Sequence, residues 1–333
     1  MSLEAPTTTE LSVDTKKISR SKIAPNLVFL APVVMMVVIA VQIPSVMTVT
    51  GITSLLILAA ILGIASVGQT WAIVTGGIDL SIPAVIGLAC VAVAKLTANG
   101  VGFGAILLLL LVLSIVIGLV HGILSSVLPI HPLIITLGTG SIITGSVLWA
   151  AGGRTGGVIP QFITDAVSPV ASTGPIPVPA VILLWVVVAF LAILLQNRTA
   201  FGLQMYALGA NPTAASYALV KPWLVRSVVY TLSAAFAATT GVLLAGFSGT
   251  ASADIGVPYM FQTLTAVVVG GTSLLGGRGG YGRTVVGVLL TTQFTMLLIG
   301  FGVSSNLQQV FLGLVILVLI AIYGRDRRIA NRL

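Results

Sequence analysis

The chain has 333 residues, of which 57% are hydrophobic and only 7% are charged, and its mean hydropathy is +1.16. Soluble domains carry about 25% charged residues because their surface faces water, so fifteen Lys and Arg with seven Asp and Glu residues exclude a soluble globule and indicate a membrane-embedded protein. The single cysteine, Cys90, excludes a disulfide framework or a cysteine-rich metal site within one chain.

The chain begins with a polar segment, residues 1–25, which predicts a cytoplasmic tail rather than a cleaved signal. A hydrocarbon core about 30 Å thick needs roughly 20 apolar residues per helix, and this length divides residues 26–323 into about ten spans. We therefore predict an all-α membrane protein, a polytopic bundle of about ten transmembrane helices, some of them broken or re-entrant. In chain order the predicted spans are 26–43, 52–75, 80–97, 104–127, 132–150, 178–196, 227–249, 259–276, 284–302 and 306–323.

The basic residues gather in segments that ten spans would place on one side of the membrane. With residues 1–25 in the cytoplasm, the basic tail 324–333 is cytoplasmic too, and every Lys and Arg except Lys95 and Arg154 falls in a cytoplasmic segment. This distribution is typical of the positive-inside rule. The net charge of +8 therefore indicates orientation in a membrane and not nucleic-acid binding.

Two connections between the predicted spans are long. Residues 151–177 are rich in Gly, Pro and Ser and are expected to face outward. Residues 197–226 are expected to face the cytoplasm and contain the stretch TAASYALV, which Pro212 and Pro222 bracket. Because proline marks helix boundaries, we expect this second connection to be an ordered element with a short helix.

The stretch GGRGGYGR (276–283) satisfies the dinucleotide-binding pattern G-x-G-x-x-G. Such a site needs an acidic residue about 20 positions later, but the next one is Asp326. The stretch GTSLLGG (271–277) has the spacing of a phosphate-binding loop, yet Gly277 stands where Lys is required. The nucleotide interpretation therefore fails, and a tight cytoplasmic turn between two spans is expected instead.

Polar side chains within the apolar spans are candidates for a translocation path. Asp79, in GGIDLS (76–81), is the only acidic residue between Asp14 and Asp165. A carboxylate at the bilayer centre costs about 2.5–3.5 kcal/mol, so Asp79 is a candidate for a role in transport. The alternative is that Asp79, or Ser81 after it, caps the following helix, and the two roles are compatible. Neutral amides and hydroxyls suit an uncharged polyhydroxylated solute, although interhelical hydrogen bonding explains any one of them alone. The candidate path residues are Gln69, Trp71, Asp79, Gln262, Thr265 and Gln293.

An internal repeat and the histidines complete the survey of motifs. VTGGIDLS (74–81) and VVGGTSLL (268–275) resemble each other, and each closes one apolar span and opens onto the next, as repeats in transporters do. His121 and His131 lie in no metal-ligand spacing, and no nucleophile or acid–base set accompanies them. We expect no catalytic residue, metal or cofactor in this chain.

The resemblance to a known family rests on five motifs, which spread over most of residues 50–323. They are GGIDLS (76–81), TLGT (136–139), YALGANPTAA (206–215), VVVGGTSLLGGRG (267–279) and GVSS (302–305). At this spacing they resemble the permease subunits of bacterial ABC importers for monosaccharides, the ribose-type group. YALVK (217–221), MFQTL (260–264) and Thr144-Gly145 depart from that group's usual residues, which leaves the particular sugar open.

The resemblance implies a sugar permease in the bacterial inner membrane, paired as a homodimer or heterodimer. It also implies two cytoplasmic ATPases and a periplasmic binding protein as partners, with residues 197–226 as the ATPase contact. The residues assigned to that contact are Arg198, Gly209, Asn211, Ala214 and Ala215. The alternatives are a permease for branched-chain amino acids or another small polar solute, and an ion-coupled secondary transporter, for which Asp79 is the one available carboxylate.

Overall fold

The computed structural model describes residues 30–128, 130–152 and 156–330, and these contain helices, turns and one isolated bridge between Thr173 and Ile176, but no β-strand. The predicted tail 1–25 and residues 331–333 of the second tail lie outside the described residues. In chain order the elements are α1 (Ala31–Gln42), η2 (Pro44–Met47), α2 (Val49–Val74), α3 (Ile82–Ala98), α4 (Phe103–Val127), α5 (Pro132–Ala151), α6 (Gln161–Ala166), α7 (Ala180–Arg198), α8 (Ala200–Ala210), α9 (Pro212–Tyr217), α10 (Pro222–Ser248), α11 (Tyr259–Val269), α12 (Tyr281–Gly300) and α13 (Ser305–Ala330).

Within the described residues, six helices are long and apolar enough to cross a bilayer, namely α2, α4, α5, α7, α10 and α12. The prediction of an all-α, multi-pass membrane protein is therefore confirmed. Every predicted span overlaps a helix, but α1, α3, α11 and the apolar part of α13 have 17 residues or fewer, so the count of ten full spans is not confirmed. The predicted span 259–276 also runs past the end of α11 at Val269. At a rise of about 1.5 Å per residue, the 11 residues of α11 cover roughly half of a 30 Å core.

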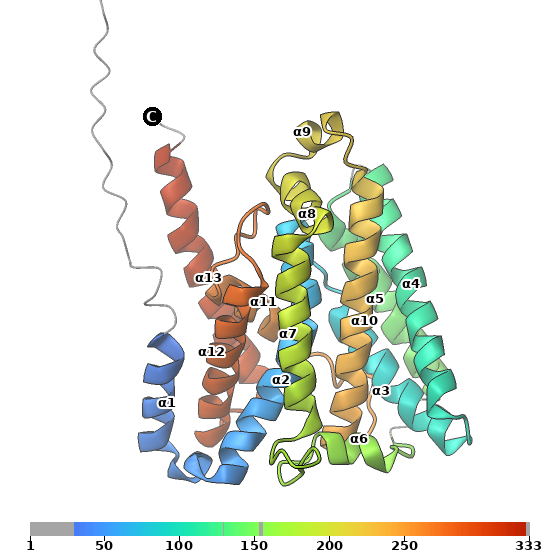
Figure 1. The fold of residues 1–333 in the computed structure, drawn as a ribbon, viewed down its shortest axis with the longest axis vertical. Helices are drawn as coiled ribbons and strands as arrows, with labels where there is room; N and C mark the ends of the chain where they lie inside the picture. The colour runs from blue at the N-terminus through green and yellow to red at the C-terminus, as the bar shows by residue number, and fades with distance from the viewer. Residues whose placement is uncertain (1–29, 129, 153–155, 331–333) are drawn as a thin grey trace, which may run out of the picture.

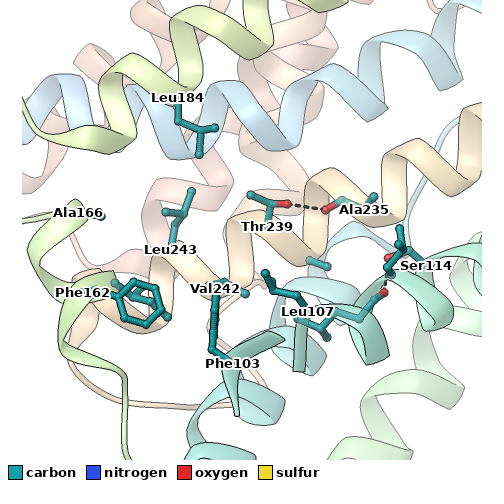
Figure 2. Close-up of a pocket in the computed structure, with 14 residues that line it drawn as sticks. Phe103, Leu107, Ser114, Phe162, Ala166, Leu184, Ala235, Thr239, Val242 and Leu243 are labelled. Carbon is teal, nitrogen blue, oxygen red and sulfur yellow. Dashed lines mark hydrogen bonds between the residues drawn. The ribbon is translucent and has the colours of Figure 1, made fainter. Parts of the chain in front are cut away.

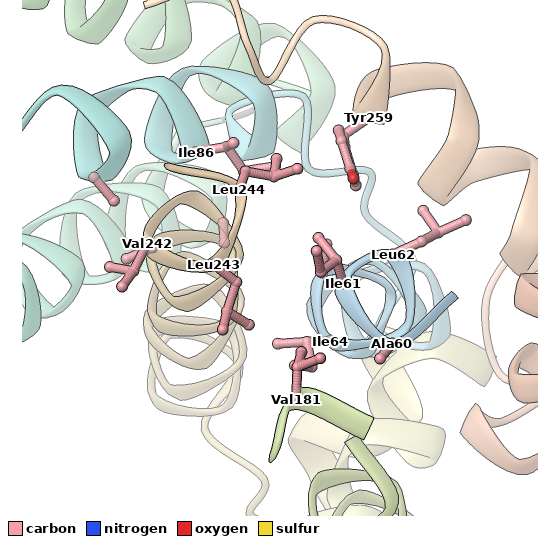
Figure 3. Close-up of a cluster of buried hydrophobic side chains, with 14 of the residues drawn as sticks. Ala60, Ile61, Leu62, Ile64, Ile86, Val181, Val242, Leu243, Leu244 and Tyr259 are labelled. Carbon is pink, nitrogen blue, oxygen red and sulfur yellow. The ribbon is translucent and has the colours of Figure 1, made fainter. Parts of the chain in front are cut away.

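Helix α2 forms the centre of the bundle. Every residue from Ala59 to Val74 is buried, as expected for a helix that is apolar on all sides and surrounded by protein. Figure 3 shows its residues Ile61, Leu62 and Ile64 among side chains from α3, α7, α10 and α11. Because α2 touches these helices at once, it holds together segments that are far apart in the sequence.

Small residues bring α4 and α10 into close contact. A Cβ atom on Gly118 would lie 2.1 Å from the hydroxyl of Thr231, and one on Gly122 would lie 2.3 Å from Ser227. Glycines four residues apart on one helix face, opposite Ser and Thr on another, are a packing solution that membrane helices favour because lipid supplies no hydrophobic drive for association. In Figure 1, α4 and α10 lie against each other near α9 and separate toward α6.

The two ends of the bundle differ. Helices α8 and α9 stand at one end, which also holds the C-terminal end of α13, and α6 lies at the opposite end (Figure 1). We call these the α9 end and the α6 end. The predicted short helix in residues 197–226 is present as α9, whereas α8 was not anticipated.

Candidate functional site

Two glycine-rich turns interrupt the bundle toward its α9 end. The first glycine turn, residues 75–81, follows α2, and its Gly76 has a φ of 85°. Its amides close the helix, because Gly76 N donates to Ile73 O at 2.9 Å and Gly77 N donates to Ala72 O at 2.9 Å. This pair of bonds is the Schellman motif, in which a left-handed glycine ends a helix.

The second glycine turn, residues 270–280, ends α11 by the same pair of bonds. Gly271 has a φ of 82°, its amide donates to Val268 O at 2.9 Å, and Thr272 N donates to Val267 O at 3.1 Å. The resemblance between the two stretches in the sequence therefore has a structural counterpart. The structure pairs Gly76 with Gly271, one residue away from the pairing that the sequence match suggests.

Gly209, in the last turn of α8, lies between the two glycine turns. A Cβ atom at Gly209 would be 1.8 Å from Val74 O and 2.7 Å from Gly277 N, so only glycine fits there without a shift. The second turn is bonded to the end of α2, since Gly277 N donates to Val74 O at 2.9 Å, and it approaches the first turn at Gly76, whose Cα would lie 3.0 Å from a Cβ atom on Gly276. We call the meeting of Gly76, Gly209, Gly276 and Gly277 the glycine contact.

A chain of hydrogen bonds ties α7 and α8 to the second glycine turn. Gln196 Nε2 donates to Tyr206 Oη at 2.7 Å, and Tyr206 Oη donates to Gly279 O at 2.7 Å. Gln196 Oε1 accepts from Tyr281 N at 2.9 Å, at the start of α12. Tyrosine is protonated at neutral pH, and burial raises the pKa of Tyr206 further above its ordinary value, so its hydroxyl remains a donor to Gly279 also in mildly alkaline solution.

The candidate ATPase-contact residues divide into exposed and internal positions. Arg198, Asn211 and Ala214 are exposed, and Asn211 Oδ1 caps α9 by accepting from Ala214 N at 3.0 Å. Ala215 is buried, and Gly209 packs inside the glycine contact. The structure thus brings all five to the α9 end, with Gly209 facing the chain's own backbone.

The tip of α9 presents apolar side chains to the outside. Tyr217 is 85% exposed and Leu219 is 88% exposed. Leu219 also has a φ of 62°, a left-handed conformation that is rare for a leucine. Such backbone outliers concentrate at functional positions, and no motif in the sequence predicted this one.

Asp79 lies in the first glycine turn and is buried, with all its oxygens engaged. Its Oδ1 accepts from Ser81 N at 3.0 Å and from Ser81 Oγ at 2.6 Å, and its Oδ2 accepts from Ser233 Oγ on α10 at 2.7 Å. Asp79 therefore fixes the start of α3 and joins it to α10. Ser81 occupies the N-cap position of α3 without a side-chain capping bond, so these bonds show Asp79 fixing the turn before the helix, and its role in transport stays a prediction.

Thr136, on α5, holds the same turn from the other side. Its hydroxyl accepts a hydrogen bond from Leu80 N at 3.0 Å and donates one to Ile78 O at 3.1 Å. The TLGT motif contains this threonine, but no spacing rule links it to residues almost sixty positions earlier. Ser233, the partner of Asp79, was likewise missed because a serine in an apolar helix is common.

Among the candidate path residues, Gln69 and Trp71 lie deep in α2. Neither amide atom of Gln69 has a hydrogen-bond partner within the described residues, and the same holds for Trp71 Nε1. Trp71 meets Phe201 and Phe236 edge to face, at ring-centroid distances of 6.3 and 6.0 Å. Its packing contacts therefore extend to α8 and α10.

The remaining candidates are dispersed over α11 and α12. Gln262 lines a cavity between α2, α11, α12 and α13, and Thr265 is buried one turn further along α11 with an unpartnered hydroxyl. Gln293 points elsewhere, because its Nε2 donates to Pro32 O in α1 at 3.1 Å. The structure does not gather the six candidates into one site.

Comparison with known proteins identifies the family. A family described as "Branched-chain amino acid transport system / permease component" matches residues 51–320. The chain is 30% identical over 271 residues to the Autoinducer 2 import system permease protein LsrD of Photorhabdus luminescens, covering 80% of each chain. It is 31% identical over 265 residues to LsrD of Escherichia coli K12, covering 78% of this chain and 79% of that one. No solved structure matches.

The chain belongs to this family of transport-system permease components. It is the permease subunit of an ABC importer and not an enzyme, and an importer of this class works with a separate ATPase and a binding protein. The resemblance to ABC permeases drawn from the sequence motifs is thereby confirmed.

Proposed function

We propose that this chain forms the transport pathway of an importer whose ATPase subunits push on α8 and α9. The observation that carries this proposal is the glycine contact, since Gly209 touches both the end of α2 and the second glycine turn. Because of these two contacts, a movement of α8 displaces both the end of α2 and the second glycine turn. Arg198, Asn211, Ala214 and the exposed tip of α9 form the ATPase surface, while Gly209 and Ala215 transmit the movement.

The solute is an uncharged polar molecule, and autoinducer 2, which the relatives' name gives as their cargo, is the first candidate. The proposed path carries neutral amides and hydroxyls at Gln69, Gln262 and Thr265, and the carboxylate among the candidate residues, Asp79, already accepts three hydrogen bonds from the chain. A monosaccharide of the ribose type fits the same chemistry. Branched-chain amino acids, named in the family description, are the second candidate.

The proposed arrangement has ten membrane segments, with α1, α3, α11 and α13 as short or partial crossings. Both termini and the α9 end face the cytoplasm of a bacterium, and the binding protein docks at the α6 end. A second permease, either another copy of this chain or a different subunit, completes the pathway. The distribution of Lys and Arg supports this orientation.

The testing experiment is purification of the tagged chain from its native membrane in a mild detergent, followed by sequencing of the proteins that accompany it. We expect an ATPase with a phosphate-binding loop and a secreted binding protein. ATP-dependent uptake by the reconstituted complex, and none by the isolated chain, supports the proposal. Uptake by the isolated chain without ATP contradicts it and favours the ion-coupled alternative.

A further inference from the structure

A cavity of about 190 Å³ with a mixed polar and apolar lining lies between α2, α11, α12 and α13. Its α2 side is formed by Leu58 and Leu62, in the half of that helix remote from the glycine contact, so the cavity lies toward the α6 end. The polar residues of its lining are Gln262, Thr292, Thr295, Ser305 and Gln308. Hydroxyl and amide groups therefore meet in one cavity between four helices.

Two hydroxyls of the lining residues are buried without a hydrogen-bond partner within the described residues. A threonine in a helix commonly donates to the carbonyl four residues earlier, as Thr263 does to Tyr259 O at 2.8 Å. Within the described residues, Thr292 and Thr295 have no such partner, although Thr292 is only 6% exposed. Buried polar groups rarely lack a hydrogen-bond partner, so we expect a molecule in the cavity to bond to these two hydroxyls.

A second cavity of about 290 Å³ shows the opposite chemistry. It lies between α4, α6, α7 and α10, and its lining is apolar apart from Ser114 and Thr239. Both hydroxyls are already used, since Ser114 donates to Leu110 O at 2.7 Å and Thr239 donates to Ala235 O at 2.9 Å (Figure 2). The larger cavity thus offers no hydrogen bond to a ligand, whereas the smaller one offers several.

Unpartnered polar groups continue from the smaller cavity toward the glycine turns. Thr265 follows Gln262 by three positions and lies on the same side of α11. Gln69 follows Leu62 by seven positions, about two helical turns, and so lies on the same face of α2. Thr265 Oγ1 and both amide atoms of Gln69 lack partners within the described residues. These faces of α2 and α11 therefore carry polar groups from the cavity toward the glycine turns.

The lining also restricts the charge of the ligand. Among the described residues, no Asp, Glu, Lys, Arg or His lines the cavity, and a buried charge without an opposite charge is strongly unfavourable. A free amino acid would bring both an ammonium and a carboxylate group. A neutral molecule with several hydroxyls would satisfy Gln262, Thr292 and Thr295 without this cost.

We propose that this cavity is a solute-binding site of the permease, specific for an uncharged molecule with several hydroxyl groups. The proposal rests on the proposed function, because it places the solute received from the binding protein at the α6 end. Thr292 and Thr295 on α12 and Gln262 on α11 hold the solute. Thr265 and Gln69 form its onward route toward the glycine contact.

The first test measures ATP-dependent uptake by the complete importer in proteoliposomes, with labelled autoinducer 2, D-ribose and L-leucine as probes. The variant Thr292→Val/Thr295→Val keeps side-chain volume and removes both hydroxyls. We expect its uptake of the hydroxylated probe to fall about tenfold, as the loss of two hydrogen bonds implies. ATPase activity stimulated by the loaded binding protein should persist. The matched control, Thr239→Val, should transport normally, since that hydroxyl faces the apolar cavity.

A second test needs no solute. In a Cys90→Ala background, Thr295→Cys should react with a membrane-impermeant thiol reagent added from the binding-protein side, and Thr239→Cys should not. Unchanged uptake by the double valine variant, or an unreactive Thr295→Cys, overturns the binding site while the permease function stands. Uptake of L-leucine alone by the wild type also overturns it. If the wild-type complex transports none of the probes with ATP, the proposed solute class fails and the inference fails with it.

Discussion

Asp79 illustrates how a buried carboxylate in a membrane protein is stabilised by hydroxyl and amide donors. Replacement by Ala leaves the hydroxyls of Ser81 and Ser233 without their acceptor, and hydrogen bonds to charged groups contribute about 1.5–3 kcal/mol each. We expect Asp79→Ala to lower the free energy of unfolding by about 2–3 kcal/mol. Asp79→Asn, which retains one acceptor oxygen and adds a donor, should lose less than half as much.

Thermal unfolding of the detergent-solubilised complex, followed by tryptophan fluorescence, measures both variants. Ser233→Ala serves as the control, since it removes one of the three bonds. Equal melting temperatures for Asp79→Ala and the wild type would show that these bonds do not stabilise the protein. If Asp79→Asn melts like the wild type but transports more slowly, the carboxylate also acts on the solute, as proposed for the path.

Leu219 combines exposure with an unfavourable backbone conformation, and the two properties can be separated by mutation. Glycine adopts a positive φ without steric cost, so Leu219→Gly should leave the melting temperature unchanged or raise it. The same change removes an apolar side chain that is 88% exposed and proposed to contact the ATPase. We expect ATPase affinity, measured by titration in nanodiscs, to fall at least tenfold.

The matched control is Val170→Gly, which removes a side chain that is 82% exposed in the segment between α6 and α7. ATPase affinity should not change in this control. A Leu219→Gly variant that binds the ATPase normally would place the contact elsewhere on the α9 end.

At the scale of elements, the glycine contact is the joint between α8 and the two helix breaks. Gly209→Ala introduces a Cβ atom that would lie 1.8 Å from Val74 O, so α8 must move away from α2. We expect ATP hydrolysis to persist while uptake falls at least tenfold, because the ATPase surface remains and the joint is displaced. The ratio of solute transported to ATP hydrolysed measures this loss.

Gly145→Ala is the control for this substitution. Gly145 is also helical, and an added Cβ atom would meet nothing within 4 Å. Its coupling ratio should equal that of the wild type. A normal ratio in Gly209→Ala would show that the movement of α8 reaches the transport path by another route, such as the bonds of Tyr206 to Gln196 and Gly279.

The sequence predicted these elements unevenly, for physical reasons. The end of α11 has a local signal, because Gly270 and Gly271 interrupt an apolar run. Either glycine could adopt the left-handed conformation that ends a helix, however, and only the packing of the folded protein selects Gly271. Gly209 was placed in the ATPase contact by resemblance. Its internal contacts with Val74 and Gly277 depend on three distant segments meeting, which no local pattern encodes.

For the whole molecule, composition predicted an all-α membrane protein, whereas burial within it could not be derived. Lipid is as apolar as a protein core, so the exposed helix α4 and the buried helix α2 both appear in the sequence as long apolar runs. The sequence did not single out the cavity residues Thr292 and Thr295. They are notable because their hydroxyls lack hydrogen-bond partners, and only the structure shows this.

The orientation of the molecule yields a prediction that the charge pattern and the structure make together. Val170, in the segment that joins α6 to α7, and Tyr217, on α9, are both more than 80% exposed and belong to opposite ends of the bundle (Figure 1). In a background without Cys90, which is buried, Val170→Cys should react with an impermeant maleimide on intact spheroplasts. Tyr217→Cys should react only after the membrane is opened, because the basic segments hold the α9 end in the cytoplasm. The reverse labelling pattern would show that the α9 end faces the outside. The proposed ATPase surface would then lie outside the cell, which contradicts the coupling proposed for α8 and α9.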